Sequence, residues 1–228
     1  MSVEGDISNA RFRDPHRSRK THLVASLAAA CMMIATIFAA WVVSLGPLPL
    51  DKAREVSTTI LDRNGKLLRA YAMADGRWRL PLDARTGVDP TYLKLLLAYE
   101  DRRFRTHAGV DPLALGRAAH QVLARGHIVS GGSTITMQLA RLIEPRRERT
   151  LYAKLRQIVR AIEIERQMSK DEILNLYLAM APFGGNLEGV RAAALSYFGK
   201  PPSQIDLSEA ALLVALPQSP VKQRRFSQ

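Results

Sequence analysis

The run of residues 23–45 constrains the fold more than any other feature, because it contains no charged side chain. About 20 apolar residues are enough for a helix to cross a bilayer, so this run predicts one transmembrane helix. A secretory signal peptide has a shorter apolar core and a small-residue cleavage site; this run is too long for one and has no convincing cleavage site. A buried helix of a soluble domain fits poorly with the length and with the basic residues beside it.

Basic residues precede the apolar run and predict its orientation. They are Arg11, Arg13, Arg17, Arg19 and Lys20. Lysine and arginine concentrate on the cytoplasmic side of membrane spans, and tryptophan favours the membrane interface, where Trp41 would lie. We therefore expect a basic, disordered cytoplasmic tail over residues 1–22 and the remainder of the chain outside.

The rest of the chain divides into a short extended part and a helical part. Residues 46–88 predict a linker with a small β region, including a β-hairpin with Asn64-Gly65 as a primed turn. Residues 89–221 predict a mainly α domain, followed by a tail over 222–228. Helix starts are marked by Asp-Pro pairs at 89–90 and 111–112 and by a capping box from Ser169 to Glu172, and Ser208 is expected to cap the last helix.

Glu100 shares a predicted helix face with apolar residues. That face carries Leu93, Leu96, Leu97, Glu100 and Phe104. A carboxylate among apolar side chains has its charged form disfavoured, so we expect a raised pKa, which suits a proton acceptor or donor near neutral pH. The alternative is an ordinary surface pair between Glu100 and Arg103, three residues further along the helix.

A second polar group follows about thirty residues later. Thr134, Gln138 and Arg141 lie at i, i+4 and i+7, so a helix beginning near residue 133 or 134 would present a hydroxyl, an amide and a guanidinium on one face. Arg149 and Lys154 come next, on a helix predicted over about 149–168. Guanidinium and ammonium groups both bind phosphate, and the alternative is a solvated basic face. For the 149–168 helix we expect core positions at Leu151, Tyr152, Leu155, Ile158 and Ile162.

The net charge of +12 indicates an anionic partner. A nucleic acid, an anionic membrane or a phosphate-bearing substrate would each fit. The sequence has no zinc-ligand spacing and no aromatic-basic RNA-binding pattern, so no nucleic-acid partner is expected. Cys31 is the single cysteine, which excludes a disulfide framework within one chain. No cluster of histidine and carboxylate residues has metal-ligand spacing, and no metal ligand is assigned.

Two sequence blocks carry a resemblance to a known family. The block E-D-x-x-F-x-x-H-x-G beginning at Glu100 resembles the first motif of the peptidoglycan glycosyltransferases, glycosyltransferase family 51. The block G-S-T-x-T-x-Q-L-x-R beginning at Gly132 resembles their second motif. The similarity runs from about residue 58 to 220 and is strongest to the 1C branch of the class A penicillin-binding proteins. It implies a mainly α, lysozyme-like glycosyltransferase domain.

The resemblance also implies a reaction and a place for it. These enzymes polymerise a lipid-linked disaccharide-peptide (lipid II) into β-1,4 glycan strands with inversion, releasing the lipid pyrophosphate at the periplasmic face of the inner membrane. Glu100 would be the catalytic base. Substrate-binding residues would be Asp101, Ser133, Thr134, Gln138, Arg141, Arg149 and Lys154. A divalent cation, Mg or Mn, assists the family's enzymes, and other cell-wall synthesis proteins and membrane lipids are expected partners.

The chain departs from the family pattern in the third motif. Where the family has R-K-x-x-E, this sequence has A-K-x-x-Q, so the second carboxylate is replaced by Gln157. That departure leaves open a catalytically weak membrane scaffold of a wall-synthesis complex. A lysozyme-like glycan-cleaving enzyme is a further alternative. The cations after Gln138 argue against it, because they favour a pyrophosphate-bearing substrate. The class A relatives continue into a transpeptidase domain, so we expect this chain to be a truncated form.

Overall fold

The computed structural model describes residues 15–84, 87–125, 132–145 and 150–218. The chain separates into two compact units, Met1–Pro47 and Leu48–Gln228. Residues 1–14 of the predicted basic tail lie outside the described part, whereas residues 15–22, expected to be disordered, are helical.

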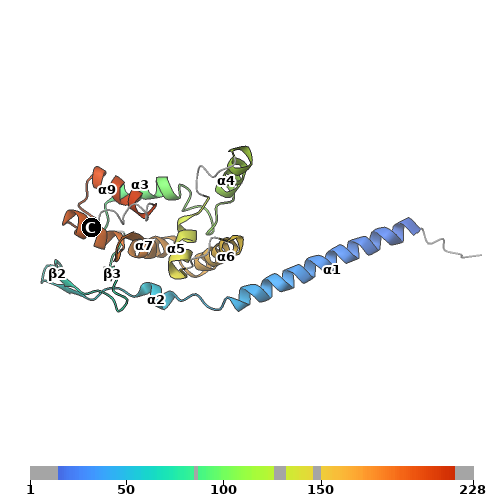
Figure 1. The fold of residues 1–228 in the computed structure, drawn as a ribbon, viewed down its shortest axis with the longest axis horizontal. Helices are drawn as coiled ribbons and strands as arrows, with labels where there is room; N and C mark the ends of the chain where they lie inside the picture. Colours follow the sequence, from blue (N-terminus) through green and yellow to red (C-terminus); the bar gives the residue numbers. More distant parts are fainter. Residues whose placement is uncertain (1–14, 85–86, 126–131, 146–149, 219–228) are drawn as a thin grey trace, which may run out of the picture. The chain divides into compact units, whose positions relative to one another are not determined.

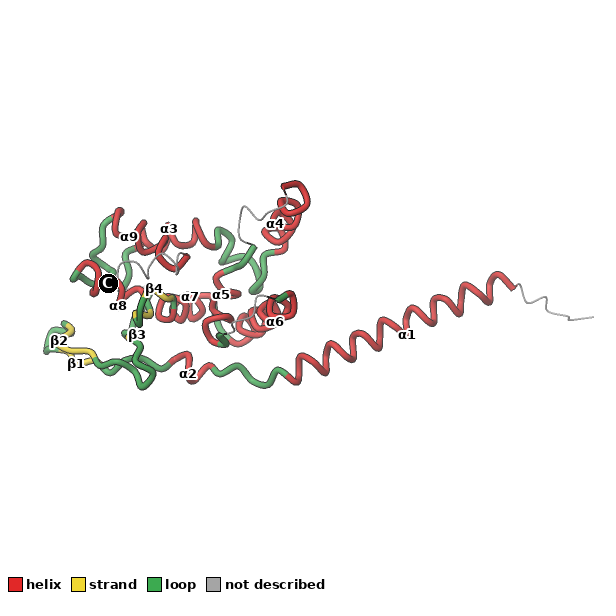
Figure 2. The backbone as a smooth tube through the Cα atoms, viewed as in Figure 1, coloured by secondary structure: helices red, strands yellow, loops and turns green. Residues whose placement is uncertain are grey.

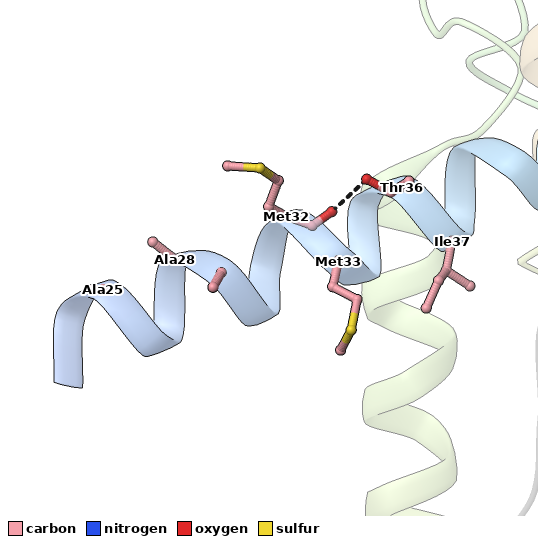
Figure 3. A pocket seen from close by; sticks show the side chains of 7 residues that line it. Ala25, Ala28, Met32, Met33, Thr36 and Ile37 are labelled. Atoms are coloured by element: carbon pink, nitrogen blue, oxygen red, sulfur yellow. Dashed lines mark hydrogen bonds between the residues drawn. The ribbon is translucent and has the colours of Figure 1, made fainter. Parts of the chain in front are cut away.

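In its described residues the first unit forms one long helix, α1 (Pro15–Ser44), which confirms the predicted N-terminal apolar helix. Its segment Val24–Ser44 is long and apolar enough to cross a membrane. Figure 3 shows a shallow hollow on this helix, lined only by residues of α1 itself and therefore open on one side. The Thr36 hydroxyl donates to the Met32 carbonyl at 2.9 Å. Such an internal bond satisfies a hydroxyl that finds no water within a bilayer.

The second unit is mainly helical, as predicted, with two small sheets (Figures 1 and 2). Its helices are α2 (Leu50–Arg54), α3 (Pro90–Glu100), α4 (Pro112–Arg125), α5 (Ile135–Ile143), α6 (Leu151–Gln167), α7 (Lys170–Met180), α8 (Val190–Phe198) and α9 (Leu207–Ala215), with a 3-10 turn at Leu216–Gln218. One sheet pairs β1 (Thr59–Leu61) with β2 (Leu67–Ala70) in antiparallel fashion. The other has the order β3 (Trp78–Arg79), β5 (Leu187–Glu188), β4 (Pro182–Gly184), with β3 parallel to β5.

Helix α5 lies at the centre of this unit and packs against both α6 and α7, while α3 packs against α9. Ile135, Met137 and Leu139 of α5 are completely buried. Figure 1 shows α7, α5 and α6 in a row, with α3 and α9 on one side of that row. This arrangement places the end of α3, which carries Glu100, over the polar side of α5.

A buried ion pair joins the segment before the β region to the three-stranded sheet. The Arg79 guanidinium is bonded to the Glu188 carboxylate at 2.7 Å. It also donates to the carbonyl oxygens of Ala53 at 2.9 Å and Glu55 at 3.1 Å, where α2 ends. A buried charge is tolerated only when it is paired and hydrogen-bonded, and Arg79 satisfies both conditions.

Four local predictions are corrected. The hairpin forms, but the turn bond runs from the Gly65 N–H to the Asp62 carbonyl, so its central residues are Arg63 and Asn64. Residues 182–189, which their glycines predict to be a loop, contain β4 and β5. The last helix is capped by Asp206, whose side chain accepts from the N–H groups of residues 208 and 209. Glu209 completes this capping box, so Ser208 is not the cap.

The fourth correction concerns the core face of α6. Leu151 is 90% exposed, and Tyr152 and Leu155 are also exposed, whereas Arg160, Ala161 and Ile164 are buried. Arg160 occupies a buried position because Glu144 and Glu163 bind its guanidinium at 2.7 Å and 2.6 Å. The helical period was predicted correctly, and the phase was wrong.

Candidate active site

Glu100 is the last residue of α3 and is half-buried. Its Oε2 accepts a hydrogen bond from Nε2 of Gln138, on α5, at 2.7 Å. The hydroxyl of Tyr177, on α7, donates to Oε1 of Gln138 at 3.2 Å. Three helices from different parts of the sequence therefore hold one carboxylate in place.

The predicted helix face ends at Glu100, so Phe104 does not lie on it. Phe104 follows in a turn and is nonetheless buried, at 1% exposure. The alternative partner of Glu100 was Arg103, whose Nε donates to the buried Asp111 at 3.0 Å. Asp111 lies just before α4, so this ion pair anchors the start of that helix to the turn.

Asp101 is buried and engaged on both oxygens. Nε2 of His107 lies 3.0 Å and 2.9 Å from them, and the backbone N–H of Ile135 donates to Oδ2 at 3.0 Å. Ile135 is the first residue of α5, so Asp101 ties the end of α3 to the start of α5. A direct contact between Asp101 and substrate stays a prediction.

Thr134 is the N-cap of α5 and is buried. Its hydroxyl oxygen accepts from the N–H of Met137 at 3.1 Å, and the hydroxyl donates to the carbonyl of Gly109 at 2.6 Å. Gly109 has a φ of +87°, and a Cβ there would lie 2.6 Å from the carbonyl oxygen of Ala161 on α6. The two motifs are thus joined at Thr134 and Gly109, and substrate binding by Thr134 stays a prediction.

Two cationic side chains, Lys154 and Arg141, lie near the start and the end of α5. Nζ of Lys154, on α6, donates to the Ser133 hydroxyl at 2.6 Å. Burial lowers the pKa of Lys154, and the nearby charge of Arg141 lowers it further. Arg141 is exposed at the end of α5. Arg149, the remaining predicted phosphate ligand, lies outside the described residues.

Arg141 connects the cations to the Glu100 group. It lies three residues after Gln138 on the same helix, and its charge acts on both Lys154 and Tyr177. The structure therefore brings Glu100, Gln138, Arg141, Ser133 and Lys154 into one neighbourhood. It does not test what each of them does with a substrate.

Gln157 has a structural partner of its own. Its Nε2 donates to the carbonyl of Met137 on α5 at 2.6 Å. An amide can make this bond to a carbonyl, whereas a carboxylate, which only accepts, cannot. The residue that departs from the family pattern therefore helps to hold α6 against α5.

The sequence did not predict a charged group formed by Glu165 and Lys170 next to Thr136 of α5. The Thr136 hydroxyl donates to Oε1 of Glu165 at 2.6 Å, and Nζ of Lys170 lies at the same distance from that oxygen. Lys170 also lies over the Phe104 ring, 4.6 Å from its centroid. No local sequence signal pairs Glu165 with Thr136, because the residues belong to different helices.

A divalent cation does not fit the residues themselves. Among the residues that the structure describes, no three histidine, cysteine or carboxylate side chains are grouped so that they could hold a metal ion. Mg²⁺ prefers several oxygen ligands. Asp101 is already engaged by His107 and the Ile135 N–H, and the other side of the site carries Lys154 and Arg141. No step is assigned to a metal held by this chain.

Comparison with known proteins establishes the family. A family model described as transglycosylase matches residues 64–228, and the chain belongs to this family. It is 46% identical over 200 residues to penicillin-binding protein 1C of Escherichia coli (strain K12), covering 87% of this chain and 25% of that protein. It is 40% identical over 170 residues to penicillin-binding protein 1A of the same strain, covering 75% and 20%.

A third relative is penicillin-binding protein 1A of Pseudomonas aeruginosa, 38% identical over 166 residues, covering 73% of this chain and 20% of that protein. The chain thus spans a quarter or less of the length of these relatives. The similarity lies in the transglycosylase region, which contains both motifs of the site.

Proposed function

We propose that the chain is a peptidoglycan glycosyltransferase that polymerises lipid II into β-1,4 glycan strands with inversion. The observation that carries this proposal is a carboxylate, Glu100, oriented by an amide donor beside the cations of Arg141 and Lys154. A base and a cationic group on adjacent helices are what transfer of a sugar from a pyrophosphate requires. Membership of the transglycosylase family supports the same reaction.

In the proposed mechanism, Glu100 accepts the proton of the acceptor sugar's 4-hydroxyl as that oxygen attacks the donor's anomeric carbon. The bond between that carbon and the lipid pyrophosphate breaks, and the pyrophosphate leaves with the electron pair. Arg141 and Lys154, with Arg149, stabilise the negative charge that develops on it. Gln138 holds the carboxylate in position through the 2.7 Å bond.

The pyrophosphate itself would bring any assisting Mg or Mn ion, since its oxygens suit these cations. The donor is the growing glycan strand and the acceptor an incoming lipid II molecule. We propose that α1 anchors the chain in the inner membrane with the catalytic unit in the periplasm, near membrane lipids and other cell-wall synthesis proteins. An anchored enzyme meets a membrane-bound substrate at a raised effective concentration.

The test compares wild type with Glu100→Gln on purified lipid II in detergent. General acid–base groups typically contribute 10²- to 10⁴-fold, so we expect kcat to fall by about that factor. Glu209→Gln is the matched control, because glutamine preserves a capping box and Glu209 lies in the cap of α9. Equal polymer from wild type and Glu100→Gln would refute the role of Glu100.

A catalytically weak scaffold is the second candidate, supported by the uncharged Gln157 in place of a family carboxylate. It predicts that wild type binds lipid II but makes no polymer. A glycan-cleaving enzyme would instead shorten preformed glycan strands in the same assay.

A further inference from the structure

Tyr177 is a polar residue in an otherwise apolar helix face. It lies on α7 between Leu176 and Leu178 and is 2% exposed. A buried hydroxyl without a hydrogen bond costs free energy, and this one donates to Oε1 of Gln138 at 3.2 Å. Phenylalanine would fill the same volume, so packing alone does not account for the hydroxyl.

The bonds on the two sides of the Gln138 amide depend on each other. A carboxylate can only accept, so the NH₂ group of Gln138 faces Glu100 and its carbonyl oxygen faces Tyr177. Burial raises the pKa of Tyr177, and the charge of Glu100 raises it further, while Arg141 opposes the shift. The phenol therefore stays protonated at neutral pH and keeps donating. Donation to the carbonyl also polarises the amide and strengthens its donation to Glu100.

We propose that Tyr177 is a positioning residue that fixes the Gln138 amide and, through it, the Glu100 carboxylate. This inference rests on the proposed glycosyltransferase function. The hydrogen bonds described above link Tyr177 to Glu100 through Gln138. Without the hydroxyl, the amide would lose the hydrogen bond that holds its carbonyl end in place.

The test is a double-mutant cycle on lipid II polymerisation with Tyr177→Phe, Gln138→Ala and both together. Loss of one neutral hydrogen bond at the catalytic base should lower kcat about tenfold in Tyr177→Phe, with KM changed by less than about twofold. In the Gln138→Ala background, the same substitution should lower kcat no further. Residues that act through a common partner give non-additive effects.

Tyr197→Phe is the matched control, because it also removes a hydroxyl that donates a hydrogen bond. Tyr197 lies on α8, and its hydroxyl donates to the Phe183 carbonyl at 2.5 Å. Its kcat should equal that of wild type, and thermal unfolding should show all four variants folded. Wild-type kcat in Tyr177→Phe, or an undiminished loss in the Gln138→Ala background, would overturn the inference and leave the proposed function intact. Absence of polymer from wild type would remove both.

Discussion

Two neighbouring carboxylates at the end of α3 lie in opposite surroundings. Glu100 is half-buried and receives its hydrogen bond from a side-chain amide that is itself oriented by Tyr177. Asp101 is buried, and its oxygens are bound by His107 and by the first N–H of α5. The difference arises from the backbone, since Glu100 is the last helical residue and Asp101 is the C-cap, with φ −159° and ψ 77°.

The comparison separates residues that hold the fold from residues available for chemistry. Two neighbouring carboxylates are directed to different tasks by one change of backbone conformation. At Asp101 the bond from the Ile135 N–H joins the end of α3 to the start of α5, and His107 engages the same carboxylate. Glu100 and Lys154 instead contact polar side chains, those of Gln138 and Ser133.

The sharpest test of this comparison makes the same chemical change at both positions. Glu100→Gln should lower kcat by about 10²- to 10⁴-fold and alter the free energy of unfolding by less than about 0.5 kcal/mol. Asp101→Asn should lower the free energy of unfolding by about 2–3 kcal/mol, because an amide NH₂ would face one of the two converging donors. Denaturant unfolding and polymerisation assays on both variants measure the two effects.

The comparison would break if the two variants lost stability equally. Glu209→Gln serves both assays as the reference, because the capping box of α9 is remote from the two motifs. A stable Asp101→Asn variant with reduced kcat would instead move Asp101 into the group of residues that act on substrate.

The next largest effect is expected at Gly109, which, like Asp101, holds elements of the fold together. Gly109→Ala should lower the free energy of unfolding by about 2–3 kcal/mol, because alanine is strained at positive φ and its Cβ would meet the Ala161 carbonyl at 2.6 Å. Gly76→Ala is the control, since Gly76 has a φ of +79° with nothing within 4 Å of the added Cβ. It should cost about 1 kcal/mol. Equal losses in the two variants would show that the contact with α6 contributes nothing.

The smallest effect on stability is expected at Lys154, which belongs to the same group of side chains as Glu100. Its pKa is lowered in the fold, by burial first and by Arg141 second, so the folded state binds this proton less tightly than the unfolded state does. The resulting penalty is fully present below the folded pKa and disappears as pH rises through the unfolded value of 10.5. Lys154→Met should therefore be slightly more stable than wild type at pH 7, and the difference should vanish near pH 11.

The same substitution should raise KM for lipid II about tenfold, because a charge-assisted contact to pyrophosphate is lost. Unfolding from pH 7 to 11 and polymerisation kinetics are the measurements. Lys200→Met is the control, as Lys200 pairs with Glu209 away from the site. An unchanged KM would contradict phosphate binding by Lys154.

Much of the helical framework could be predicted because its signals are local. Asp89 caps α3 by accepting from the Thr91 N–H, and Ser169 and Glu172 form the predicted capping box of α7. These interactions span three residues or fewer. The face of α6 was predicted wrongly because burial of Arg160 depends on Glu144, which lies before α6 in the chain.

The sequence indicated which residues belong to the candidate site, but not which hydrogen bonds join them. The motifs indicated Glu100, Gln138 and Lys154, but no sequence spacing reveals that Ser133 bonds Lys154 or that Tyr177 reaches Gln138. Such contacts depend on how α5 packs between α6 and α7. Tyr177 belongs to a block, K-x-x-I-L-x-x-Y-L from Lys170, that resembles the family's fourth motif and was interpreted as structural.

The start of α5 has a consequence for how an anion can be bound. Free N–H groups at a helix start commonly bind phosphate, but here Asp101 and Thr134 already accept from the N–H groups of Ile135 and Met137. In the proposed function, recognition of pyrophosphate would therefore fall to the side-chain cations of Arg141 and Lys154, whose attraction is screened over about 10 Å in 0.1 M salt. In that function, binding of the lipid II headgroup would weaken as the ionic strength rises.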